Sequence, residues 1–209
     1  MKSFKKMGQA VAAGSLLLIS ATAAAVPITT LYSTGVDSSG VSLAVGSIEQ
    51  HYQVAAALPS IFTPVVTSHG AYIANSASSS WINLPGGNSS ATYQTTFDLT
   101  GYDVSSASLN LNIAVDNSIS DVLINGVSTG FSIAYGYPAF QSWHNLAISN
   151  NFLEGLNTLQ FLAVNSGGPG AFRVEASGDA DIAKVSEPGT LALFGLGLVG
   201  LSLTRKRKA

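Results

Sequence analysis

The amino-acid sequence predicts an all-β fold, a two-sheet antiparallel sandwich that makes up the middle of the chain. Apolar and polar residues alternate along several segments, which is typical of half-buried strands. Clusters of Gly, Pro, Asn and Ser separate these segments, and no stretch of residues 26–185 keeps a helical period for more than about two turns. Many short strands joined by turns favour a sandwich.

Strand signals are weakest in the first third of this middle region. There we expect strands at residues 28–32, 41–45, 52–56 and 71–74. The most regular alternation lies in residues 108–116, where one face carries Leu109, Leu111, Ile113 and Val115. The other segments that alternate in this way are 93–99, 159–163 and 172–176. Each is predicted to be a strand with one buried face.

Turn residues separate the predicted strands. Asn125-Gly126 is the best hairpin turn, because both residues tolerate a positive φ angle. Further turn residues occur at 85–88, 101, 136–138, 155–157 and 167–170. The intervals between these turns leave room for strands only.

Residues 93–178 resemble the jelly rolls of galactose-binding-like domains. The residues that carry the resemblance are Thr96-Phe97-Asp98-Leu99, Asp116-Asn117, and segments 122–126, 152–159 and 161–165. In segment 152–159, Gly155 supplies an unusual backbone angle and Asn157 can hydrogen-bond within its own turn. Jelly rolls of this kind serve as sugar-binding modules, enzyme appendages and adhesion domains, so the resemblance implies a fold more than an activity.

The N-terminus has the features of a secretory signal peptide over residues 1–25. Lys2, Lys5 and Lys6 precede an apolar core at 11–19, and Ala23-Ala24-Ala25 forms an A-x-A cleavage site. The apolar run is too short for a buried core helix, and its basic residues lie on the N-terminal side only. We expect signal peptidase to cleave here, so that the mature chain begins at Val26.

Charge is distributed unevenly along the chain. Residues 26–186 hold two basic and ten acidic residues, a formal charge of −8, while the other basic residues lie in the terminal segments. Such a surface repels phosphate backbones, which argues against nucleic acid as a partner. The chain has no cysteine, so this region of about 160 residues must be stable without disulfides.

Residues 184–209 consist of three parts. A linker containing Pro188 and Gly189 precedes an uncharged apolar run at 191–203. The chain then carries a basic cluster, Arg205, Lys206, Arg207 and Lys208. As a helix, the apolar run would cover about 20 Å of the roughly 30 Å of bilayer hydrocarbon. The tail therefore predicts a short transmembrane helix with a cytoplasmic basic stop.

This tail resembles the PEP-CTERM sorting signal, which exosortase-type proteases of exopolysaccharide-secreting bacteria recognise and cleave. The residues that match are Val185, Glu187, Pro188, Gly189 and Thr190, and Ser186 replaces the first proline of the family pattern. The resemblance implies export, transient anchoring in the inner membrane, and cleavage that leaves the protein at the cell surface or in the extracellular matrix. An ordinary single-pass tail anchor is the alternative.

Catalytic patterns are sparse. Gly126-Val127-Ser128-Thr129-Gly130 fits the G-x-S-x-G of a nucleophile elbow, but it follows a hairpin turn and leads into more strand. His51, His69 and His144 lack metal-ligand spacing. The ten acids allow many carboxylate pairs of the kind a glycosidase needs, and the sequence does not show which face each other.

Calcium is the metal that an acidic domain favours, because it prefers carboxylate, amide and carbonyl oxygens. The jelly-roll resemblance implies a structural calcium between an early loop and the last strand. The candidate ligands are Glu49, Glu175 and Asp179. A solvated acidic surface is the alternative.

Aromatic residues near turns are the candidate ligand-binding residues. An aromatic ring can stack on the C–H face of a pyranose while polar side chains bind its hydroxyls. The aromatic candidates are Trp81, Trp143, Tyr135 and Tyr137. The polar candidates are Asp116, Asn117 and Arg173. Each tryptophan is equally well explained as a core residue.

Three hypotheses follow for residues 26–183, the predicted sandwich domain. The favoured one is a non-catalytic exported protein whose sandwich binds glycan or exopolysaccharide. The second is a secreted hydrolase of polysaccharide or ester substrates, which would require a cleft with paired carboxylates or a Ser-His-acid set. The third is a purely structural matrix component, in which all four aromatic candidates would be buried.

Overall fold

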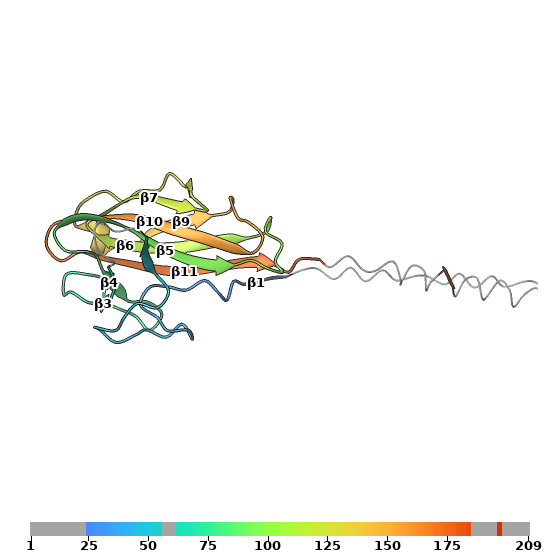
Figure 1. The fold of residues 1–209 in the computed structure, drawn as a ribbon, viewed down its shortest axis with the longest axis horizontal. Coiled ribbons are helices and arrows are strands. Elements are labelled where there is room, and N and C mark those ends of the chain that lie inside the picture. Colours follow the sequence, from blue (N-terminus) through green and yellow to red (C-terminus); the bar gives the residue numbers. More distant parts are fainter. Residues whose placement is uncertain (1–23, 56–61, 185–195, 198–209) are drawn as a thin grey trace, which may run out of the picture.

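The computed structural model describes residues 24–55, 62–184 and 196–197, and it shows an antiparallel two-sheet β-sandwich (Figure 1). The predicted fold class is confirmed. The predicted signal helix and nearly all of the predicted transmembrane helix lie outside the described residues. Within the described ranges, no helix combines the length and the apolar character that a membrane span needs.

Six strands form the first sheet. They are β1 (Ala25–Pro27), β3 (Val66–Thr67), β4 (Trp81–Asn83), β6 (Ser108–Asp116), β9 (His144–Ile148) and β11 (Ala171–Asp181). Their order is β3-β4-β11-β6-β9, and β1 also pairs with β11. The long pairing of β11 with β6 forms the centre of this sheet, with Val174 opposite Ile113.

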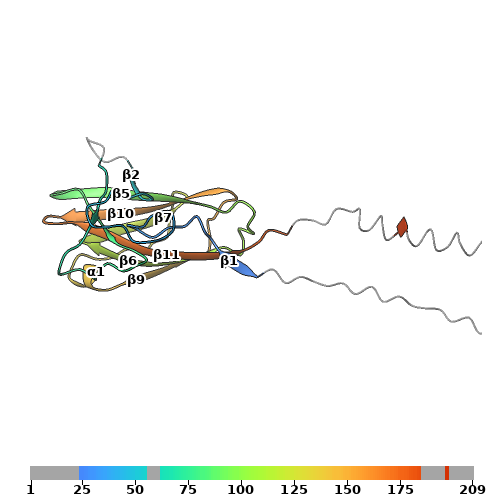
Figure 2. The same cartoon turned by 90° about the horizontal axis from the view of Figure 1, so that it is seen from below.

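Five strands form the second sheet. They are β2 (Gln53–Ala55), β5 (Asn88–Asp98), β7 (Ser118–Ile124), β8 (Val127–Ser128) and β10 (Leu156–Ser166). Their order is β2-β5-β10-β7-β8. Figure 2 shows this sheet stacked over the first, with the short helix α1 (Pro138–Gln141) on the outside of the first sheet.

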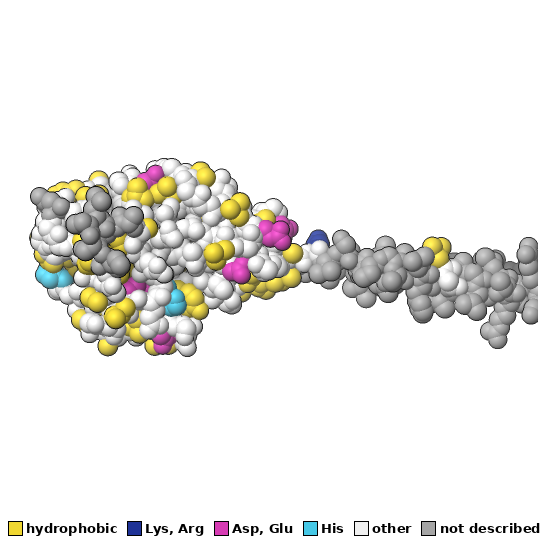
Figure 3. All heavy atoms as spheres, in the orientation of Figure 1, with side chains coloured by type: hydrophobic (Ala, Val, Ile, Leu, Met, Phe, Trp, Pro, Cys, Tyr) yellow, Lys and Arg dark blue, Asp and Glu magenta, His cyan; other side chains and the backbone are white. Residues whose placement is uncertain are grey.

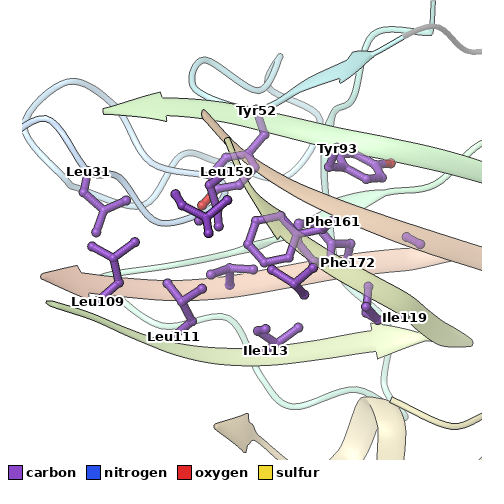
Figure 4. Packing of buried hydrophobic residues seen from close by; sticks show 14 of the residues in the cluster. Leu31, Tyr52, Tyr93, Leu109, Leu111, Ile113, Ile119, Leu159, Phe161 and Phe172 are labelled. Atoms are coloured by element: carbon purple, nitrogen blue, oxygen red, sulfur yellow. The ribbon is translucent and has the colours of Figure 1, made fainter. Parts of the chain in front are cut away.

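The core lies between the two sheets. The side chains of Phe161 on β10 and Phe172 on β11 meet across it with ring centroids 4.9 Å apart, and Tyr93 stacks on Phe172 at 5.1 Å (Figure 4). Tyr52 completes this aromatic group, and burial raises the pKa of both tyrosine hydroxyls well above the ordinary value. Aromatic side chains bury more area per residue than aliphatic ones, so these four rings contribute strongly to the core.

The regular alternations in the sequence are confirmed as strands. Segment 108–116 is β6, and its four apolar side chains all face the core. Segments 159–163 and 172–176 fall in β10 and β11, and segment 93–99 falls in β5 except for its last residue, Leu99. The predicted hairpin turn joins β7 to β8, with φ angles of 52° at Asn125 and 79° at Gly126.

Most of the early strand predictions are wrong. Segment 52–56 contains β2, but 28–32, 41–45 and 71–74 are turns and loops. Their backbone N–H groups bond one at a time to separate partners, most of them in other loops, instead of forming a ladder. In the second segment, for example, Ser42 N–H donates to Ala77 O (3.0 Å) while Leu43 N–H donates to Gly35 O (2.8 Å).

The sequence predicted that nothing but strands would lie between the turns, and this prediction is wrong at one place. Residues 138–141 form α1, a single helical turn with a proline in its first positions. Proline suits the start of a helix because the first N–H groups have no partner within the helix. The turn signal at 136–138 therefore marks a helix entrance.

The described chain enters and leaves the sandwich at the same end. β1 pairs with the last residues of β11, with Val26 opposite Ala180. Figures 1 and 2 both show β1 beside the last residues of β11 at this end. We call it the tail end. The opposite end, which holds α1, the last residue of β6 and the turn between β10 and β11, we call the far end.

Gly35 provides a sharp test of loop packing. Its φ angle is +67°, and a Cβ atom there would lie 2.6 Å from the Cβ of Ser80. We expect Gly35→Ala to lower the free energy of unfolding by about 3 kcal/mol, because backbone strain and a steric clash add. Gly40, with φ +76° and no atom near its would-be Cβ, is the control, and Gly40→Ala should cost only about 1 kcal/mol. Urea denaturation of residues 26–184 measures both losses, and equal losses would contradict this packing.

Candidate functional site

Arg173 lies on the outer face of β11 and is nevertheless buried. Its neighbours Phe172 and Val174 point into the core, so the alternation of the strand directs Arg173 away from it. Only 1% of Arg173 is exposed, because the loop at 72–80 covers this part of the sheet. The sequence candidate for a sugar contact is thus inside the protein.

The guanidinium group of Arg173 is surrounded by acceptors. Its Nε donates to Ser79 Oγ (2.8 Å), one Nη to Ala74 O (2.5 Å), and the other Nη to Ser76 Oγ (3.0 Å) and Glu175 Oε1 (3.3 Å). Desolvation lowers the pKa of Arg173, and the nearby Glu175 carboxylate opposes this shift. The group remains charged at neutral pH, since an arginine pKa starts above about 12.

Trp143 covers the remaining side of the guanidinium. The Cζ atom of Arg173 lies 4.7 Å from the centre of the Trp143 ring, which is a cation–π contact. Trp143 also packs on a second apolar cluster outside the sheet, made of Trp81, Ala114, Ala171, Tyr72, Ile73 and Phe140. The first sheet therefore has packed layers on both faces at the far end.

Trp81 is the centre of this second cluster. It is fully buried, and its indole N–H donates to Ile73 O (2.7 Å). Of the two explanations for this tryptophan, the core explanation holds. Trp81 is therefore a core residue of the second cluster and is not available to a ligand.

A line of rings runs from this cluster to the solvent. His69 lies 5.0 Å from Tyr72, Tyr72 lies 5.6 Å from Phe140, and Phe140 lies 5.2 Å from Tyr137, measured between ring centroids. Tyr137 is 71% exposed, and Tyr135 is 70% exposed. We call His69, Tyr72, Tyr135, Tyr137, Phe140 and Trp143 together the aromatic surface.

Asp116 and Asn117 hold the far end together. The Oδ2 atom of Asp116 accepts from the Tyr72 hydroxyl (2.7 Å), and its Oδ1 accepts from Asn117 Nδ2 (2.6 Å). Burial, then the hydrogen bond and charge of Asp116, raise the pKa of Tyr72. Asn117 Oδ1 accepts from Ser166 N–H (2.7 Å). Both polar candidates already have protein partners, and Asp116 is buried.

The structure thus collects the candidate residues at the far end but gives them different roles. Tyr135, Tyr137 and part of Trp143 face solvent, while Trp81, Asp116 and Arg173 lie beneath. Sequence reasoning missed Tyr72 and Phe140. Tyr72 fell in a segment interpreted as a strand, and the only signal for Phe140 was its position just after Pro138.

The three calcium candidates do not share a site. Glu49 accepts from the N–H groups of Gly35 (2.6 Å) and His51 (2.9 Å), whereas Glu175 accepts from Arg173. Asp179 pairs with β1 near the tail end. Among the residues with described positions, no group of three or more His, Cys, Asp or Glu side chains could hold a metal ion. The donor set predicted from the sequence is therefore not assembled.

The G-x-S-x-G segment forms a hairpin edge. Ser128 lies in the short strand β8, and its Oγ accepts from Gly130 N–H (3.0 Å). The hollow beside it, about 240 Å³ in volume, is otherwise lined by Thr129 and residues 146–151, which include neither histidine nor acid. His144, the later histidine, instead contacts Pro138 O through Nε2 (3.0 Å). The segment does not form a nucleophile elbow.

The sorting residues Val185, Ser186, Glu187, Pro188, Gly189 and Thr190, and the basic cluster 205–208, lie outside the described residues. The last described residue before them is Lys184, exposed at the tail end.

Replacing Arg173 tests its structural role. Arg173→Met keeps the aliphatic stem but leaves Ala74 O and two serine hydroxyls without their donor. We expect the free energy of unfolding to fall by about 3 kcal/mol. Glu175→Gln, which keeps an acceptor beside the guanidinium at a part-exposed position, should cost about 1 kcal/mol or less. Urea denaturation of residues 26–184 measures both changes in the free energy of unfolding. If Arg173→Met lowers it by less than about 1 kcal/mol, the value of one exposed ion pair, Arg173 does not hold the loop in place.

Comparison with solved structures finds carbohydrate-binding modules. The CBM35 from Paenibacillus barcinonensis is 14% identical, with 60% of this chain and 91% of that chain covered and a TM-score of 0.37. The family 11 carbohydrate-binding module of the cellulosomal cellulase Lic26A-Cel5E of Clostridium thermocellum is 14% identical, with 66% and 91% covered and a TM-score of 0.38. A family 35 module from an environmental isolate is 12% identical, with 69% and 95% covered and a TM-score of 0.37. Likeness at this level says nothing about ligands.

No curated protein matches the chain. The C-terminal segment, in contrast, has a clear match. Residues 184–208 match the PEP-CTERM protein-sorting motif. The resemblance of the tail is thereby confirmed, and the chain carries a PEP-CTERM protein-sorting motif.

Proposed function

We propose that this protein is an exported, exosortase-processed protein of the cell surface or extracellular matrix, and that its sandwich binds uncharged glycans through the aromatic surface without catalysis. Signal peptidase removes residues 1–25, and the sorting protease cleaves near Glu187-Pro188. Between these events the chain is anchored in the inner membrane by its tail. The PEP-CTERM match supports the sorting part of this proposal.

The binding part of the proposal rests on two exposed tyrosines that lie next to the fixed helical turn α1. Tyr135 and Tyr137 present most of their rings to solvent. The adjoining helix α1 is fixed to the 71–73 loop by two hydrogen bonds, since Phe140 O accepts from Ile73 N–H (3.1 Å) and Gln141 Nε2 donates to Ala71 O (3.3 Å). Aromatic rings on a fixed frame lose little entropy on binding, and they suit the C–H faces of pyranose rings.

Charge supports uncharged glycans as the ligand class. Between residues 26 and 184 the only lysine and arginine residues are Arg173 and Lys184. Arg173 is buried and Lys184 lies at the tail end, so neither offers a cation to a ligand on the aromatic surface. A domain with a formal charge of −8 repels anionic polysaccharides at low ionic strength.

The position of the surface also fits a tail-anchored protein. Both terminal segments join the sandwich at the tail end, whereas the aromatic surface lies at the far end. While the tail holds the protein in the membrane, the aromatic surface faces away from it. A purely structural protein would have buried all four aromatic candidates, and the exposure of Tyr135 and Tyr137 favours binding instead.

Alanine substitution of both tyrosines tests the binding site. We expect Tyr135→Ala with Tyr137→Ala to weaken glycan binding at least about tenfold, because each stacking contact contributes about 1 kcal/mol. Leu156→Ala, an exposed apolar position at the tail end, should bind as the wild type does. Binding of residues 26–184 to an array of neutral and anionic glycans measures this. No glycan bound by the wild type, or equal binding by the double variant, would refute the proposal.

A further inference from the structure

Exposed apolar side chains gather at the tail end, next to the point where the chain leaves the sandwich. Leu153, Leu156 and Ile182 are 56%, 67% and 52% exposed. The first two flank Glu154, which lines a hollow of about 420 Å³ together with Tyr102, Asp103, Val104, Ala183 and Lys184. Figure 3 shows hydrophobic and acidic side chains together on this part of the domain.

This end is held rigidly by backbone hydrogen bonds. Ala183 N–H donates to Gly101 O (2.9 Å), and Asp103 N–H donates to Asp181 O (2.8 Å). Leu99 N–H donates to Gly155 O (2.8 Å), which ties the 149–156 loop to the same surface. The chain is therefore fixed to the domain as far as Ala183, and the loops around it form one continuous surface.

The sorting motif follows this fixed point after very few residues. Lys184 and Pro188 are four residues apart, and even a fully extended chain spans only about 14 Å over that distance. A protease that holds several residues around Glu187-Pro188 in its active site must therefore lie against the tail end of the sandwich. Contact with the domain is a geometric consequence of cleavage at this position.

We propose that the tail end is a docking surface for the sorting protease, with Leu153, Leu156 and Ile182 as its apolar contacts and the hollow at Glu154 as a receptor for a side chain of the protease. This inference rests on the proposed cleavage near Glu187-Pro188. The protease then recognises a folded part of its substrate in addition to the linear sorting motif.

The charge of this surface favours a protein partner over the membrane itself. Asp103, Glu154 and Asp181 lie around the hollow or beside it. Hydrogen bonds from the Ser105 hydroxyl (2.6 Å) and N–H (3.0 Å) lower the pKa of Asp103, so this carboxylate is charged at neutral pH. Anionic lipid headgroups repel such a surface, whereas a protein partner can supply basic and apolar groups to match it.

The test uses the full-length chain in a cell that contains the sorting protease. We expect Leu153→Ser with Leu156→Ser to slow removal of the basic tail about tenfold, as the loss of two apolar contacts implies. Glu154→Lys, an exposed charge reversal in the hollow, should slow it as well. Val45→Ser is the control, because Val45 is 62% exposed but its neighbour Gly46 bonds to β3, away from the tail end. Pulse-chase labelling with intact-mass spectrometry gives the rates.

The outcomes separate this inference from the proposed function. If the Leu153/Leu156 and Glu154 variants lose the basic tail as fast as Val45→Ser, the docking surface is refuted while sorting stands. If the wild type itself keeps its basic tail outside the cell, both proposals fail. Thermal unfolding of each variant separates slow processing from misfolding, since substitutions at these exposed positions should leave the melting temperature nearly unchanged.

Discussion

The buried guanidinium of Arg173 is the interaction on which the far end depends. A charge taken out of water costs several kcal/mol unless it is fully paired, so the acceptors around it must stay in place. Three of them, Ala74 O, Ser76 Oγ and Ser79 Oγ, come from one loop. Arg173 therefore fixes that loop against the outer face of β11, where an ordinary sandwich strand would face solvent.

The aromatic surface is built on this fixed loop. With the loop in place, Trp81 is sealed beneath Ile73 and Tyr72, and Tyr72 in turn supports Phe140 of α1. Tyr137 rests on Phe140 and reaches solvent. The same sheet thus serves two purposes, with one face buried in the core and the other supporting the candidate binding surface.

How far the sequence predicts this structure depends on how local each signal is. The alternation in β6 and the Asn125-Gly126 turn are set by neighbouring residues, and both were predictable. Arg173 and Ala74 are 99 positions apart, so no local pattern shows that one covers the other. The loops at 28–32, 41–45 and 71–74 were wrongly predicted as strands for the same reason. Several of their backbone N–H groups bond singly to partners that are distant in the sequence. Tyr135 and Tyr137 were found because their exposure follows from a local turn.

Hydrogen–deuterium exchange of the Arg173→Met variant tests most directly whether this residue holds the far end in place. If it does, amides in segments 72–80 and 137–144 exchange faster than in the wild type, while those of β5 and β10 in the opposite sheet keep their protection. Unchanged exchange in both segments would contradict the account, because the far end would then be ordered without its buried charge.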